Sequence, residues 1–170
     1  LPSEWRTRRA YVDAVGFDAA REMLIKYVNE GAPLTTYVGH SGPTMWSFEG
    51  LFHVSDIADL TNFGRPTVAM QWGCWNTYYV EPRYDSIGDA LLLHGDQGAA
   101  AVLGSATLSW VPSARAFSEF LGPVVAQSGV RIGDAIIHAK RELAAGHPDA
   151  RDVLWGWTLL GDPTLVLNRE

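Results

Sequence analysis

The chain has 170 residues, 47% of them hydrophobic, with a formal net charge of −6 and a pI near 5.3. This length predicts one domain with a substantial buried core. The acidic balance and the absence of a basic run exclude a typical nucleic-acid or membrane-surface role, and no apolar run is long enough to predict membrane insertion. The single cysteine, Cys74, cannot form an internal disulfide.

The first third of the chain predicts a helix followed by a strand. Residues 9–15 are expected to form a short strand or an irregular lead-in. Apolar residues at helical spacing then predict a helix over 19–30, with Asp18 as its N-cap and Gly31 at its end. The β-branched run at 34–38 predicts a buried strand.

A second strand is predicted at 66–72, after a short helix at 55–60. Each of these two strands ends on a glycine that is followed at once by a reactive side chain, in Gly39-His40 and Gly73-Cys74. Two buried strands joined by a helical crossover lie parallel, so their carboxyl ends share one edge of the sheet. We therefore expect His40 and Cys74 to face one crevice, at the edge where open α/β sheets place their sites.

The remaining elements complete an α/β pattern. Ser86 and Asp89 form an acidic variant of a capping box at the start of a helix. A third strand, two further helices and a closing strand are predicted at 99–103, 113–126, 133–145 and 164–167. Alternating strands and helices predict a three-layer αβα sandwich with a mostly parallel sheet. Four strands are few for such a sheet, and the chain starts without an initiator Met, so further strands are expected upstream.

His40 and Cys74 together offer the chemistry of a thiol hydrolase. A cysteine is a strong nucleophile as its thiolate, which a nearby imidazole favours. Backbone N–H groups of Ser41 and Cys74, each directly after the end of a strand, are candidates for the oxyanion hole. Taken singly, a buried-strand cysteine is more often a small core residue and a lone histidine a structural group. Their matched positions, after glycines at adjacent strand ends, favour a catalytic interpretation.

Other kinds of site fit the sequence less well. Gly39-His40-Ser41-Gly42-Pro43 resembles the Gly-x-Ser-x-Gly nucleophile elbow, but Pro43 stands where the second glycine belongs. A serine hydrolase that uses Ser41 remains an alternative. The other histidines show no metal-ligand spacing, so no cofactor is expected.

Short motifs follow one another in an order that carries a resemblance. A helix ending in Asn-x-Gly precedes a strand that runs into Gly-His, and a later strand ends in Gly-Cys. The matching segments are Asn29–Gly31, Tyr37–Ser41, Trp46, Gly73–Cys74, Ser86–Leu91, Gly98–Ser105, Ile132–Ala135 and Gly161–Leu165. In this order the chain resembles the gingipain family of cysteine peptidases, part of the caspase-like superfamily. The combined order is specific, whereas each motif alone is weak.

The resemblance implies a caspase-like fold, with Cys74 as nucleophile and His40 as general acid–base. It also implies a specificity pocket beside Gly73, with Trp72 and Trp110 as walls. The implied protein is a secreted or cell-surface bacterial endopeptidase acting on peptides or proteins, in contact with an upstream domain or segment of the same protein. Residues 1–170 would then be its catalytic domain without the family's upstream strands. Structural calcium is possible by the same resemblance, with unknown ligands.

Three departures from the family pattern leave a second interpretation open. Ser41 replaces a glycine after the histidine, and its side chain is expected to strain or narrow the oxyanion turn. The segment after Cys74 is more aromatic than usual, and the upstream region that supplies an acidic pocket residue in Arg-specific members is absent. A degenerate, peptidase-like binding or scaffold module is therefore the competing class. Glu49 and Asp56 lie in the right loop for a third catalytic residue, but nothing singles either out.

Overall fold

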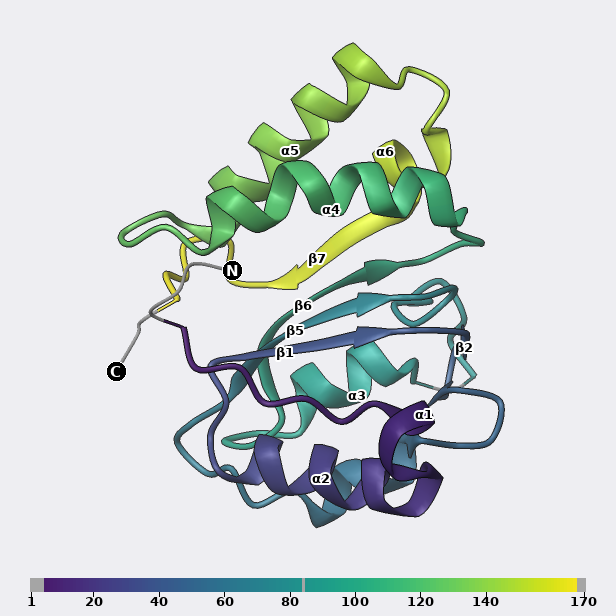
Figure 1. Ribbon diagram of the computed structural model, residues 1–170, viewed down its shortest axis with the longest axis vertical. Coiled ribbons are helices and arrows are strands. Elements are labelled where there is room, and N and C mark those ends of the chain that lie inside the picture. Colours follow the sequence, from purple (N-terminus) through teal and green to yellow (C-terminus); the bar gives the residue numbers. More distant parts are fainter. Residues whose placement is uncertain (1–4, 84, 168–170) are drawn as a thin grey trace.

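The computed structural model describes residues 5–83 and 85–167. At its centre lies a four-stranded sheet in the order β1-β5-β6-β7. The strands are Leu34–Val38 (β1), Thr67–Trp72 (β5), Ala99–Ser105 (β6) and Trp157–Gly161 (β7). The first three are parallel, and β7 runs antiparallel to β6. Figure 1 shows helices on both faces of this sheet, which confirms the predicted αβα sandwich with a mostly parallel sheet.

One face of the sheet is covered by three helices from the second half of the chain. They are Val111–Val125 (α4), Ile132–Gly146 (α5) and Arg151–Gly156 (α6). Buried residues of α4 and α5 pack in one apolar cluster with Val68, Met70 and Leu103 of the sheet. In Figure 1 these helices form the upper layer.

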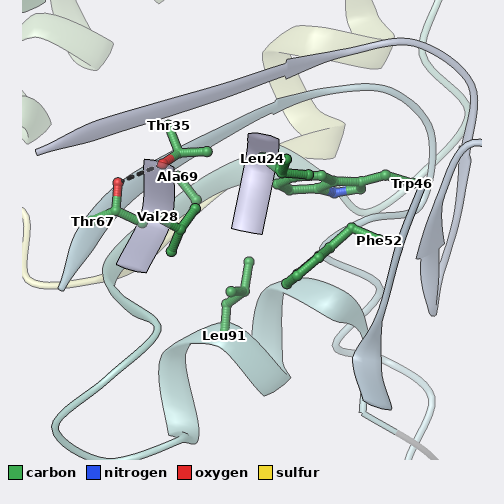
Figure 2. Close-up of a pocket in the computed structure, with 8 residues that line it drawn as sticks. All are labelled: Leu24, Val28, Thr35, Trp46, Phe52, Thr67, Ala69 and Leu91. Atoms are coloured by element: carbon green, nitrogen blue, oxygen red, sulfur yellow. Dashed lines mark hydrogen bonds between the residues drawn. The ribbon is translucent and has the colours of Figure 1, made fainter. Parts of the chain in front are cut away.

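The opposite face is covered by elements from the first half. They are Val12–Val15 (α1), Phe17–Asn29 (α2), a 3-10 helix at Val54–Asp59 (η1) and Ile87–Leu93 (α3). A small antiparallel sheet joins them, formed by Ser41–Gly42 (β2), Met45–Trp46 (β3) and Phe52–His53 (β4). Figure 2 shows the interior of this layer, where Leu24, Trp46 and Leu91 converge on a cavity of about 10 Å³. Such a volume barely holds one water molecule, so this core is closely packed.

The N-terminal lead-in differs from its prediction. Instead of a strand or irregular chain, residues 12–15 form one turn of helix, α1. Gly16 then takes φ +83°, and α2 begins at Phe17. Asp18 therefore lies inside the first turn of α2 and makes no side-chain cap, although its charge still suits the positive end of the helix. The capping box of Ser86 and Asp89 at α3 is confirmed.

The predicted closing strand at 164–167 was wrong. The last strand of the sheet is β7, and Val166 makes only an isolated antiparallel bridge to Arg131. The cause is a turn in which Asp162 Oδ1 accepts hydrogen bonds from the backbone N and the Oγ1 of Thr164, at 2.8 and 2.7 Å. This Asx turn redirects the chain away from the sheet directly after β7.

Among the helices of residues 5–83 and 85–167, none is both long enough and apolar enough to cross a bilayer.

Candidate active site

The ends of β1 and β5 meet at one edge of the sheet, as the sequence predicted. Val38 pairs with Trp72 at the last position of the parallel register, and Gly39 N donates a hydrogen bond of 3.1 Å to Trp72 O. His40 and Cys74 each follow two residues after this last pair. The sheet register therefore brings both loops out at the same carboxyl edge.

Gly73 lies in contact with the loop that carries His40. A Cβ built on Gly73 would lie 2.7 Å from Gly39 O and would overlap Ser41 Oγ. Real Cβ atoms do not approach other atoms so closely, so a side chain at this position would push the two loops apart. Glycine at position 73 is what allows the histidine and cysteine loops to touch.

The Cys74 thiol is half-buried and points towards the loop after β6. Ser109 N donates to Cys74 Sγ at 3.4 Å, and the thiol donates back to Ser109 O at 3.7 Å. The buried indole of Trp157 donates to Ser109 Oγ at 3.1 Å and holds this loop in place. Ser109 therefore holds the sulfur through both of its backbone polar atoms. The sequence analysis missed Ser109, because only the folded chain brings it to the cysteine.

His40 is exposed, and its ring stacks on Phe48 with a centroid separation of 5.5 Å. Its backbone is firmly held, because His40 O accepts hydrogen bonds from Tyr37 Oη at 2.5 Å and from Ser47 N at 2.8 Å. Burial raises the pKa of the Tyr37 hydroxyl, which keeps it protonated as a donor. Within the described residues, no hydrogen bond joins the His40 ring to Cys74; Phe48 is the ring's stacking partner.

Neither acidic candidate for a third catalytic residue contacts the His40 ring by a hydrogen bond in the described part of the chain. Glu49 accepts a short hydrogen bond from Ser47 Oγ, which lowers the pKa of its carboxyl, and the charge of His40 lowers it further. Asp56 instead accepts from His53 N at 2.7 Å and pairs with Arg21 at 2.6 Å. Asp56 is therefore committed to capping η1 and joining it to α2.

Asn76 is a buried residue that the sequence analysis also missed. Its side-chain amide donates to Gln71 O at 3.1 Å and to Ser41 Oγ at 3.3 Å, while its Oδ1 accepts from Ser105 N at 3.0 Å. A Cβ on Gly104 would overlap Asn76 Oδ1, so that glycine leaves the room for this amide. Asn76 thus connects β5, β6 and the histidine loop directly beneath the candidate site.

An apolar groove of about 540 Å³ runs along β1 and α4, from Leu34 and Val125 to an end at the carboxyl edge of the sheet. Trp72 and Val38 line it from the strands, and Val111 and Arg115 from the helix. Trp110 is 70% exposed and lies next to Val111, at the beginning of α4. Of the two predicted walls, Trp72 lines the groove and Trp110 stands beside it.

A search of the described residues for metal sites found no group of three or more His, Cys, Asp or Glu side chains arranged to hold a metal ion.

Comparisons with known proteins place these features in context. The sequence profile of Peptidase family C25 matches residues 1–168. No curated protein sequence gives a significant match.

Three solved structures share the fold. The complex of Porphyromonas gingivalis RgpB pro- and mature domains matches with a TM-score of 0.78 and 18% identity, over 88% of this chain and 37% of that chain. The Arg specific cysteine proteinase gingipain R matches with a TM-score of 0.77 and 17% identity, over 88% of this chain and 36% of that chain. A structure described only as a protease matches with a TM-score of 0.72 and 18% identity, over 85% of this chain and 37% of that chain. The chain therefore spans little more than a third of the chains it matches.

Proposed function

Because the chain belongs to peptidase family C25, we propose that it is the part of a cysteine endopeptidase that carries the nucleophile Cys74 and the general acid–base His40. The thiolate attacks the carbonyl carbon of a peptide bond, and the carbon–nitrogen bond then breaks. His40 gives a proton to the leaving amine. Water, activated by His40, then hydrolyses the thioester and releases the acid.

One observation carries this proposal: the N–H of Ser109 points at Cys74 Sγ from 3.4 Å. The thiol in turn donates to Ser109 O at 3.7 Å, so the backbone of Ser109 holds Sγ in one position, and its N–H is a donor for the thiolate once it forms. The partial exposure of Cys74 leaves the sulfur within reach of a substrate.

The hairpin β2–β3 supports Ser41 N as an oxyanion donor. Ser41 pairs with Trp46, and the hairpin's hydrogen bond from Ser47 N to His40 O flanks that pair. Ser41 thus occupies a non-hydrogen-bonded position of the antiparallel ladder, where the N–H points away from the partner strand. Together with Cys74 N, it would bind the oxyanion on the side where the cysteine loop lies.

The substrate is a peptide or protein, and the end of the groove at Trp72, the residue before Gly73, would take one of its side chains, with Trp110 at the rim. Another segment of the same protein would contact this chain, because the structural matches extend well beyond it and one is a complex of pro- and mature domains. Following the family, we place the protein outside the bacterial cell or on its surface. The proposed reaction needs no cofactor.

The structure bears differently on the two alternatives, a serine hydrolase and a binding module. A serine hydrolase is disfavoured, since Ser41 is only 3% exposed and its hydroxyl donates to Cys74 O. A peptidase-like binding module is favoured by the stacking of His40 on Phe48 rather than against the thiol. These two rings and the exposed Trp110 would then belong to a contact surface.

The rate of Cys74 alkylation by iodoacetamide, measured against pH on the folded protein, separates the enzyme from the module. An assembled dyad gives a thiolate that titrates below the free value of about 8.5, and His40→Ala moves the midpoint back towards that value. His138→Ala, an exposed histidine on α5, serves as the matched control and leaves the profile unchanged. If the pH midpoint of alkylation is the same in the wild type and in His40→Ala, and no Cys74-dependent hydrolysis is detected, the protein is the binding module instead.

A further inference from the structure

The peptide unit directly after the candidate nucleophile is held at both of its polar atoms. Its oxygen, Cys74 O, accepts a hydrogen bond of 2.8 Å from Ser41 Oγ. Its nitrogen, Trp75 N, donates one of 3.0 Å to Thr107 O. The orientation of this peptide is thereby fixed between the histidine loop and the loop after β6.

The two hydrogen bonds hold Trp75 in a backbone conformation that is unfavourable for a bulky residue. Trp75 has φ +55°, in the left-handed region that bulky side chains rarely occupy. Such a conformation persists only where the surroundings hold it, and it occurs most often at functional sites. The side chain of Trp75 is itself 37% exposed, so core packing of the indole alone does not explain the conformation.

The hydrogen bond from Ser41 to Cys74 O is itself supported by Asn76, which lies beneath the serine. Asn76 Nδ2 donates to Ser41 Oγ, so the serine hydroxyl accepts from Asn76 while it donates to Cys74 O. Both side chains are almost fully buried, at 3% and 0% exposed, and Asn76 is anchored to β5 and β6 as described above. The three groups form a chain of hydrogen bonds that leads from the centre of the sheet to the nucleophile's own carbonyl.

We propose that Ser41 and Asn76 are positioning residues that hold the Cys74–Trp75 turn in the geometry needed for thioester chemistry. The inference rests on the proposed function. It also corrects the expectation that a side chain at position 41 would narrow the oxyanion turn: the hydroxyl points inwards and ties the two loops together. In this chain, the serine that replaces glycine after the histidine strengthens the site.

Ser41→Ala and Asn76→Ala in the full-length protein test the proposal. Each is expected to lower kcat about ten- to a hundred-fold with little change in KM, because a misplaced nucleophile affects the chemical step and leaves the groove intact. Since both residues act on one hydrogen-bonded chain, the double variant should lose little more than either single one. The pH midpoint of Cys74 alkylation should shift in Ser41→Ala, since Sγ then changes its position relative to the N–H and the carbonyl of Ser109.

Thr35→Val is the matched control, because it removes a buried hydroxyl that joins the same two strands at their other end. It should lower the thermal midpoint without changing kcat or the alkylation midpoint. The proposal is overturned if Ser41→Ala, like Thr35→Val, leaves kcat and the alkylation midpoint unchanged. If Asn76→Ala does not fold, Ser41→Ala is sufficient to decide. If the wild type shows no Cys74-dependent hydrolysis, the proposed function fails, and the alkylation midpoint still decides whether Ser41 positions the thiol.

Discussion

The strands β1 and β5 are joined by side-chain hydrogen bonds at both of their ends, but the two joints are built differently. At the amino end, Thr35 Oγ1 and Thr67 Oγ1 lie 2.9 Å apart, both buried, in the layer shown in Figure 2. The β5–β6 register shifts at Thr67, but neither threonine has a positive φ, and the bond adds to the pairing of two neighbouring strands. Its contribution is to the stability of the sheet.

At the carboxyl end, the corresponding bond runs from the Ser41 side chain to the Cys74 backbone and holds a turn that contains a left-handed Trp75. Gly73 is in such close contact that no side chain fits, and the thiol is half-exposed. The same kind of bond thus maintains an unfavourable conformation in one place and a favourable one in the other. A left-handed residue next to the lone cysteine, with none at the two threonines, is consistent with the proposal that the site lies at the carboxyl end.

Of the variants that test this difference between the two ends, Cys74→Ala should have the largest effect. We expect hydrolysis of a peptide substrate to fall by at least roughly a thousand-fold, as when the nucleophile is removed from other hydrolases. The fold should survive, since the thiol is not a disulfide partner and, within the described residues, its hydrogen bonds are to Ser109. Turnover assays and a thermal melt on the same preparation check both statements. Full turnover in the variant would remove Cys74 from the mechanism.

His40→Ala should have the next largest effect. Loss of a general acid–base typically costs about 10²- to 10⁴-fold in rate, and the pH dependence of kcat/KM near neutrality should flatten. Because the ring is exposed and only stacks on Phe48, the thermal midpoint should hardly move. Phe48→Leu is the companion variant: it removes the stacking partner and keeps the imidazole, so it should retain most of the turnover. An unchanged pH profile in His40→Ala would contradict the assignment.

Gly73→Ala tests the close contact between the two loops. The added methyl group overlaps Ser41 Oγ and Gly39 O, so the free energy of unfolding should fall by about 1–3 kcal/mol, the usual cost of overpacking. The matched control is Gly42→Ala, in β2 on the histidine side of the contact, where a Cβ meets nothing within 4 Å. Denaturant melts of the two variants should therefore separate clearly. Equal stabilities would show that the loops are free to move apart.

Much of this fold follows from local sequence signals. The β-branched runs at β1 and β5 and the Ser86–Asp89 capping box were read correctly, because strand composition and helix caps are local properties. The closing strand was misplaced since two apolar runs flank Asp162, and only the Asx turn decides which of them joins the sheet. The first turn at 12–15 was missed because it is too short to show a helical period.

The site was predictable only in part, for the same reason. His40 and Cys74 stand out because each follows a glycine at the end of a predicted strand, and the register then brings their loops together. Asn76 and Ser109 have no such mark in the sequence. Both residues act through contacts with residues about thirty positions away in the sequence. Asn76 contacts Ser105 and Ser41, and Ser109 contacts the Cys74 thiol. Only the folded chain shows these contacts.

The smallest expected effect, that of Thr35→Val, defines the other side of the comparison. The substitution keeps the shape of the side chain and removes its hydroxyl, and Thr67 Oγ1 retains Val68 O as an acceptor at 3.3 Å. No buried hydroxyl is left without a partner, so the loss should be about 1 kcal/mol, the net value of one hydrogen bond. That corresponds to a drop of roughly 2–4 °C in Tm for a domain of this size. Calorimetry measures the drop, and turnover measured alongside it should equal that of the wild type. A loss of turnover here would mean that both ends of the strand pair position the cysteine, and the contrast between a stabilising end and a functional end would no longer hold.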